Sequence, residues 1–76
     1  MMLGTVVGSI WSTKKAPALS GQTFLTVDTP GGLLVCADCV GAGEGETVLV
    51  ATGGAARKAA GEAIPVDAAV IGIVDR

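Results

Sequence analysis

Apolar side chains recur with the spacing of β-strands in five short segments of this 76-residue chain. Segments rich in Val, Ile and Thr, bounded by glycine or proline, are typical of strands. The predicted strands are Leu3–Thr13, Gln22–Asp28, Leu33–Asp38, Glu46–Thr52 and Val66–Asp75. Five short strands in one domain predict an all-β fold, a small and partly open five-stranded β-barrel like the oligonucleotide-binding (OB) fold.

Two of the connections have clear local signals. The stretch TPGG (Thr29–Gly32) predicts a tight turn, because Pro30 presets one backbone angle and the glycines allow positive φ. The stretch GGAARKAAG (53–61) predicts at most two turns of helix, and Gly61 ends it. The expected architecture is therefore a barrel with one short helix.

The chain has more apolar surface than one small barrel can bury. Half of its residues are hydrophobic and 16% are charged, against about 25% charged in an average domain. In the last predicted strand both faces are apolar: Val66, Ala68, Val70 and Val74 point one way, and Ala69, Ile71 and Ile73 point the other. A barrel interior uses only one face. The other face must contact the helix or another subunit, so we expect self-association.

Composition disfavours a membrane or nucleic-acid partner. The longest uncharged stretch, Met1–Thr13, is shorter than the ~20 apolar residues of a spanning helix, and Lys14 and Lys15 follow it, whereas a secretory signal has its positive charges first. We expect a soluble, cytoplasmic protein.

The net charge is −2, so the chain lacks the positive charge that binds phosphates, and its aromatic residues, Trp11 and one Phe, are too few for base stacking. Trp11 is expected to be a core or interface anchor.

The glycine-rich stretch VGAGEG (Val40–Gly45) does not fit a phosphate-binding loop. Its spacing is G-x-G-x-G, it precedes a predicted strand where a dinucleotide loop precedes a helix, and Glu44 and Glu46 would repel a phosphate. We interpret these glycines as positions where the backbone turns sharply or approaches another backbone.

Cys36 and Cys39 form a C-x-x-C pattern, which raises the possibilities of zinc or redox chemistry. Zinc needs about four ligands, and the chain has no His and no further Cys. On a strand these two residues are about 10 Å apart and face opposite sides, too far for a disulfide. We expect two separate core thiols.

No nucleophile has a base nearby in the sequence, so we predict no catalytic, cofactor-binding or metal-binding residues and no enzymatic activity.

Three stretches together resemble one protein family. DCVGAGEGETVLVATGGAAR (Asp38–Arg57), PVDAAVIGIVD (Pro65–Asp75) and the N-terminal MLGTVVGSIWSTKKAPALSG are similar to the bacterial microcompartment vertex proteins of the EutN/CcmL type. The resemblance covers residues 1–76 as a single vertex domain. It implies a five-stranded barrel with a short helix that assembles as a cyclic homopentamer. Such pentamers close the corners of a carboxysome or metabolosome shell whose remaining surface consists of hexameric shell proteins.

The resemblance also implies where subunits meet. The expected interface or pore-rim residues are Val40, Gly41, Ala42, Gly43, Glu44, Gly45, Arg57 and Asp67. Arg57 stands at the arginine of the family motif, and Asp67, Glu44 or Glu46 would be its partner across the boundary. The turn at Thr29–Gly32 is shorter than in many relatives.

Two alternatives from other functional classes remain. One is a small monomeric oligonucleotide-binding barrel, which binding to single-stranded DNA would reveal. The other is a small thiol-redox protein, which would need a lowered thiol pKa at Cys36 or Cys39.

Overall fold

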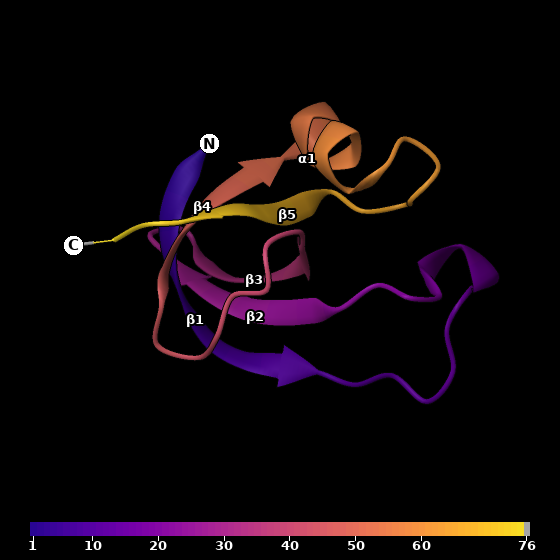
Figure 1. Cartoon of the computed structure of the whole chain (residues 1–76), viewed down its shortest axis with the longest axis horizontal. Coiled ribbons are helices and arrows are strands. Elements are labelled where there is room, and N and C mark those ends of the chain that lie inside the picture. Colours follow the sequence, from indigo (N-terminus) through magenta and orange to yellow (C-terminus); the bar gives the residue numbers. More distant parts are fainter. Residues whose placement is uncertain (76) are drawn as a thin grey trace.

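The computed structural model describes residues 1–75, which form five strands, one α-helix and one 3₁₀ turn (Figure 1). In chain order the elements are β1 (Met2–Ile10), η1 (Pro17–Leu19), β2 (Phe24–Thr29), β3 (Gly32–Asp38), β4 (Thr47–Thr52), α1 (Gly53–Ala60) and β5 (Ala68–Ile73). All five predicted strands are present. The first and last are shorter than expected, because β1 ends at Ile10 and β5 begins at Ala68.

The strands close into a barrel in the order β1-β2-β3-β5-β4. The predicted five-stranded barrel is therefore confirmed, and it is closed where a partly open one was expected. Every neighbouring pair is antiparallel except β3 and β5, which are parallel and pair only at Ala37↔Ala69 and Asp38↔Val70. The barrel is thus closed by a seam two residues long. A parallel pair of strands needs a long crossover connection, which here consists of the β3–β4 loop, β4 and α1.

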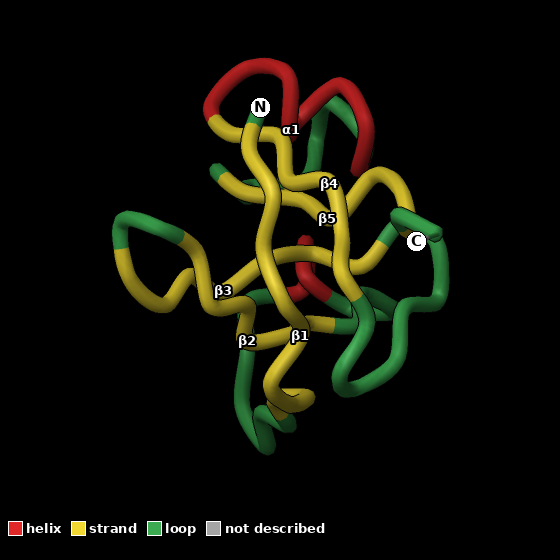
Figure 2. The backbone as a smooth tube through the Cα atoms, turned by 90° about the vertical axis from the view of Figure 1, so that its left-hand side faces the viewer, coloured by secondary structure: helices red, strands yellow, loops and turns green. Residues whose placement is uncertain are grey.

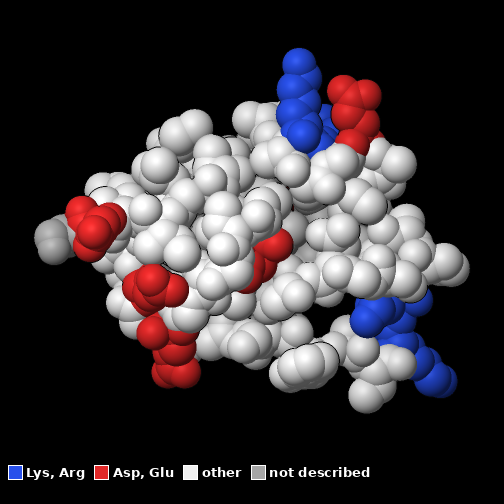
Figure 3. All heavy atoms as spheres, in the orientation of Figure 1, with Lys and Arg blue, Asp and Glu red and all other residues white. Residues whose placement is uncertain are grey.

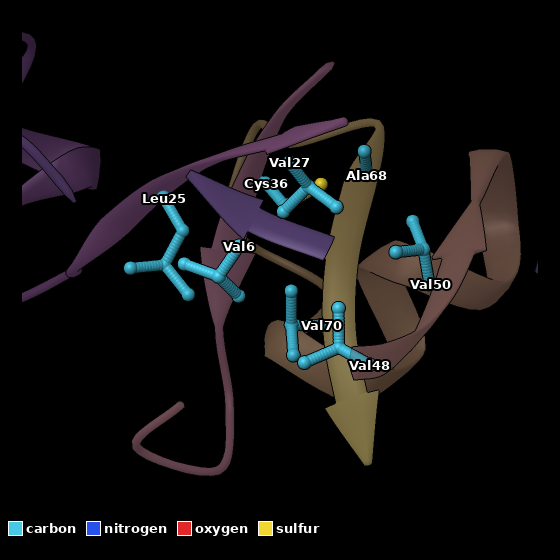
Figure 4. Close-up of a cluster of buried hydrophobic side chains, with 8 residues drawn as sticks. All are labelled: Val6, Leu25, Val27, Cys36, Val48, Val50, Ala68 and Val70. Atoms are coloured by element: carbon cyan, nitrogen blue, oxygen red, sulfur yellow. The ribbon is translucent and has the colours of Figure 1, made fainter. Parts of the chain in front are cut away.

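The barrel interior is filled by small and β-branched side chains (Figure 4). The cluster consists of Val6, Leu25, Val27, Cys36, Val48, Val50, Ala68 and Val70. Alternation of inward and outward residues along each strand places them there, and Ala68 and Val70 of β5 share one face, as the sequence predicts. Burial of each such valine or leucine side chain contributes about 1.5–3 kcal/mol to folding.

A second apolar cluster lies outside the barrel, beneath α1. Its buried members are Ala37, Ala56, Val66 and Ala69, and the partly buried Leu19, Phe24, Ala60, Ile64 and Ile71 pack against them. The helix thus covers part of the outer face of β5, as expected for Ala69 and Ile71. Val66, expected to point the same way as Ala68 and Val70, belongs to this outer cluster, because it precedes β5 and does not share the alternation of the strand.

Local backbone features follow from particular residues. Pro30 and Gly31 form the two-residue turn between β2 and β3, and the Thr29 hydroxyl donates a 2.7 Å hydrogen bond to the Gly32 carbonyl. Gly32 adopts φ = 117°, as expected of a turn glycine. The helix ends at Ala60, and Gly61, with φ = 127°, stops it as predicted.

Candidate subunit interface

The glycine-rich loop between β3 and β4 (39–46, the GAGEG loop) is organised by the carboxylate of Asp38. Oδ1 of Asp38 accepts hydrogen bonds from the N–H groups of Val40 (3.1 Å), Gly41 (2.9 Å) and Ala42 (3.3 Å), and Oδ2 also accepts from Ala42 (3.1 Å). Three consecutive N–H groups therefore converge on one side chain. An aspartate that bonds backbone N–H groups just downstream of itself is a common device for starting a turn.

The second half of the GAGEG loop is attached to its surroundings by Glu46 and β1. The N–H of Gly43 donates a 2.6 Å hydrogen bond to Oε1 of Glu46. Gly45 donates to the carbonyl of Val6, and the N–H of Val6 donates to the carbonyl of Glu46. Ala42 packs against the barrel core. The loop is therefore a fixed surface, and Glu46, a predicted partner of Arg57, already bonds its own loop.

Positive φ is adopted at two of the loop's glycines, Gly41 (75°) and Gly45 (87°). Most side chains would be strained there. The structural interpretation of the glycines as sharp turns therefore holds at these positions, and the loop precedes β4 with no helix after it.

Arg57 and Asp67 lie in a different part of the molecule from the GAGEG loop. Figure 1 shows α1 at the top of the molecule and the β3–β4 connection turning at the lower left of the barrel. Arg57 is exposed on α1, and Asp67 is exposed just before β5. The carbonyl of Asp67 accepts a 2.8 Å hydrogen bond from Gly53 N–H, which fixes Asp67 beside the start of the helix. The six loop residues thus form one group, while Arg57 and Asp67 belong to the helix end of the protomer.

The two cysteines have different environments. Cys36 is buried in the barrel, as expected, whereas Cys39 is exposed, so the prediction of two core thiols is wrong for Cys39. The reason is that β3 ends at Asp38 and Cys39 lies in the bend that follows. Burial, with a smaller effect of Asp67, raises the pKa of Cys36 from 9.0 to about 11, and burial together with Asp38 raises the pKa of Cys39. A redox-active thiol needs a lowered pKa, so neither cysteine fits that alternative.

Charged side chains are unevenly distributed over the surface. Figure 3 shows basic side chains in two places, on α1 and on the long connection after β1, and acidic side chains toward the C-terminal end, near the centre of this face and beside the basic ones of α1. Lys14 and Lys15 belong to that connection (11–23), and Trp11 begins it with 93% of its surface exposed. Trp11 is therefore not a core residue of the protomer. Its expected role as an interface anchor stays a prediction.

Sequence reasoning missed two features of this surface. The first is Asp38, although an aspartate directly before a glycine-rich stretch is a turn signal. The second is the outer side of β3, where Leu33 and Val35 are 65% and 55% exposed. Leu33 and Val35 alternate with Leu34 and Cys36, but nothing local in this apolar segment showed which side has no cover.

The part of the chain that the structure describes offers little support for other classes of site. Among residues 1–75, no three His, Cys, Asp or Glu side chains are grouped as metal ligands would be. Over the same residues, no helix has both the length and the apolar character needed to cross a membrane.

Comparison with known proteins agrees with the resemblance of the sequence motifs. The profile of the family described as "Ethanolamine utilisation protein EutN/carboxysome" matches residues 1–75. The carboxysome shell vertex protein CcmL of Synechocystis is 48% identical, over 99% of this chain and 83% of its own length. The microcompartment shell vertex protein GrpN of Rhodospirillum rubrum is 45% identical, over 99% of this chain and 93% of its own length.

Solved structures show the same fold. The pentameric shell protein GrpN from Rhodospirillum rubrum superposes with a TM-score of 0.87 at 42% identity, over 100% of this chain and 95% of its own chain. The chain thus shares its sequence, over nearly its whole length, and its barrel fold with these shell vertex proteins. The chain belongs to the EutN/CcmL family of bacterial microcompartment shell vertex proteins, which are structural proteins and not enzymes.

Proposed function

We propose that this protein assembles as a homopentamer and caps the vertices of an icosahedral bacterial microcompartment shell. The observation that carries the proposal is its similarity, over the full chain, to the pentameric GrpN. A vertex cap has a structural role, in which it closes the shell so that a volatile or toxic intermediate is retained. The protein would reside in the shell, within the bacterial cytoplasm.

The surface of the protomer supports assembly. Large apolar side chains that remain exposed include Leu3, Val7, Leu33, Val35 and Ile73. They lie on outer strand faces that α1 leaves uncovered. A head-to-tail contact between two different surfaces closes into a ring when its rotation divides a full turn, and such permanent interfaces are more apolar than transient ones.

We assign the predicted interface residues to two regions of the ring. The GAGEG loop, with Val40, Gly41, Ala42, Gly43, Glu44 and Gly45, would lie at a subunit boundary or at the rim of the central opening. Its hydrogen bonds to Asp38 and Glu46 support this role, because a fixed loop loses little entropy when it docks. Arg57 and Asp67 would meet across the boundary near α1. The outer rim of the ring would adjoin hexameric shell proteins.

Native mass spectrometry tests the oligomeric state directly. One chain has a mass of 7.4 kDa, so five copies give 5 × 7.4 = 37 kDa. We expect this species at micromolar concentration. A monomer or dimer alone would contradict the proposal. Co-expression with a hexameric shell protein then tests the vertex role: closed particles are expected with the wild-type chain, and particles with open corners without it.

A further inference from the structure

Most of β3 has no neighbouring strand on one side. β2 pairs with β3 from Gly32 to Ala37, but β5 joins β3 only at Ala37 and Asp38. The segment Gly32–Cys36 is thus an edge strand in an otherwise closed barrel. Figure 2 shows the β2–β3 hairpin standing clear of the other strands on the left of that view.

The hydrogen-bonding direction identifies the backbone groups at this open edge. The N–H of Asp38 donates to the carbonyl of Thr23, on the side of β2. The N–H of Cys39 donates to the carbonyl of Val70, on the side of β5. Because backbone groups alternate in direction along a strand, the N–H and C=O groups of Leu33 and Val35 point away from β2, toward the open side.

This edge borders a groove of about 530 Å³. Its lining comes from β3, from the junction of β4 and α1, and from the start of β5: Leu33, Leu34, Val35, Thr52, Gly53, Asp67 and Ala68. The side chains of Leu33 and Val35 stand 65% and 55% exposed beside it. An unpaired edge next to an apolar groove matches the surface that an added strand uses in β-augmentation.

The sequence of the edge contains none of the usual devices that prevent pairing. Proteins block exposed edges with lysine, proline, a bulge or a very short strand. GLLVC (32–36) has no charge and no proline, and the only register shifts in the barrel lie in the β1–β2 and β4–β5 pairs. An edge like this would pair with other chains unless something covers it permanently.

We infer that the open β3 edge at Leu33 and Val35 is the docking surface for a second copy of this chain, whose backbone extends the sheet. The inference rests on the proposed ring and adds the surface that closes it. A second copy is the occupant we assign to this edge. An uncharged edge would pair with other chains unless it is always covered, and other copies of this chain are present wherever the chain folds. Pairing of two identical β3 edges would give a two-fold dimer, so in a ring the edge must receive a different segment of the neighbour.

Asp67 is the one charged residue that lines the groove. Docking would remove its carboxylate from water, which is costly unless a donor accompanies it. The neighbouring copy must therefore bring a positive or N–H group to this point. The exposed Arg57 of the neighbour has the required chemistry.

Amide hydrogen exchange of the wild-type protein tests the inference. The amides of Leu33 and Val35 are expected to exchange at least tenfold more slowly in the concentrated ring than in the protein diluted to monomers. The amide of Leu34 is the internal control, because it faces β2 and is protected in both states. Equal exchange of Leu33 and Val35 in ring and monomer would overturn the assignment of this edge.

A substitution provides a second test. Val35→Lys adds a charge at the edge and leaves the β2 pairing intact, so we expect a folded monomer with a protected Leu34 amide. If that variant fails to fold, Val35→Thr keeps the branched shape and should weaken ring association at least tenfold. A Val35→Lys pentamer, or a Val35→Thr ring that dissociates on dilution at the same concentration as the wild type, contradicts the edge assignment alone. If the wild-type chain itself is not a pentamer, the proposed function fails.

Discussion

The N–H of Gly41 lies 2.9 Å from Oδ1 of Asp38, the last residue of β3. That oxygen also accepts from Val40 and Ala42, while Asp38 pairs with Val70 at the two-residue seam between β3 and β5. One aspartate thus lies where the barrel closes and where the GAGEG loop begins. The shape of the loop and the closure of the barrel are coupled through this residue.

Asp38→Ala should destabilise the protein and loosen the GAGEG loop. Removing a side chain that caps backbone N–H groups costs about 0.5–2 kcal/mol. Asp38→Asn keeps an oxygen in place of Oδ1 and should cost less than half as much. Urea unfolding gives the stabilities, and amide exchange of residues 40–42 reports the loop. If the alanine and asparagine variants prove equally stable, the carboxylate does not organise the loop.

Gly4→Ala should weaken the β1–β2 packing. A Cβ at Gly4 would stand 2.5 Å from Cγ1 of Val27 and 3.0 Å from the carbonyl of Asp28. Overpacking of this kind costs about 1–3 kcal/mol. Gly8→Ala, in the same strand, is the control, since its Cβ would meet nothing within 4 Å. Thermal unfolding of the two variants is the measurement, and a Gly4→Ala protein as stable as Gly8→Ala would refute the close approach.

Cys39 should react slowly with a thiol reagent in the folded protein, because it is exposed but its pKa is raised, whereas Cys36 should react only after unfolding. Cys39 is exposed and Cys36 is buried, and the raised pKa values leave both thiols protonated near neutral pH. Reaction of the folded protein with one equivalent of label, followed by peptide mapping, distinguishes the two. Preferential labelling of Cys36 would contradict the fold around β3.

Stability should decline in alkali because of Cys36. Its pKa rises from 9.0 to about 11 on folding, so between these values the unfolded chain loses the proton that the native state keeps. The contribution of the protonated Cys36 thiol to the free energy of unfolding is complete below pH 9 and is lost as pH rises through 11. Urea unfolding from pH 8 to 11 should show this decline in the wild type and a smaller one in Cys36→Ala. Parallel profiles for the two proteins would exclude Cys36 as the cause.

Arg57→Ala should shift the proposed ring toward monomers, while Lys58→Ala should not. Both substitutions remove one positive charge from α1, so they form a matched pair. Loss of a solvated arginine changes stability by about 0.5 kcal/mol or less, whereas loss of an arginine paired across an interface costs about 2–5 kcal/mol. Dissociation on dilution, followed by native mass spectrometry, compares them. Equal behaviour would place Arg57 on the free surface.

The sequence by itself determined most of the secondary structure and the family. Alternating apolar residues located all five strands, and Gly61 located the end of α1, because these signals act within a few residues along the chain. The same local alternation put Ala68 and Val70 on one face of the last strand, and the structure places both in the core. The motif between Asp38 and Arg57 indicated the family, which the comparisons confirm.

Only the tertiary structure decided how far each strand pairs and what its ends expose. Val66 lies in the cluster under α1 and Cys39 is exposed. Both residues lie just beyond the end of a strand, where the alternation of the strand no longer decides which way a side chain points. The free edge at Leu33 and Val35 exists because β5 meets β3 over two residues only. The pairing of β3 with β5 joins residues far apart in the sequence, Ala37 with Ala69 and Asp38 with Val70, so its extent depends on the packing of the whole barrel and has no signal within either strand.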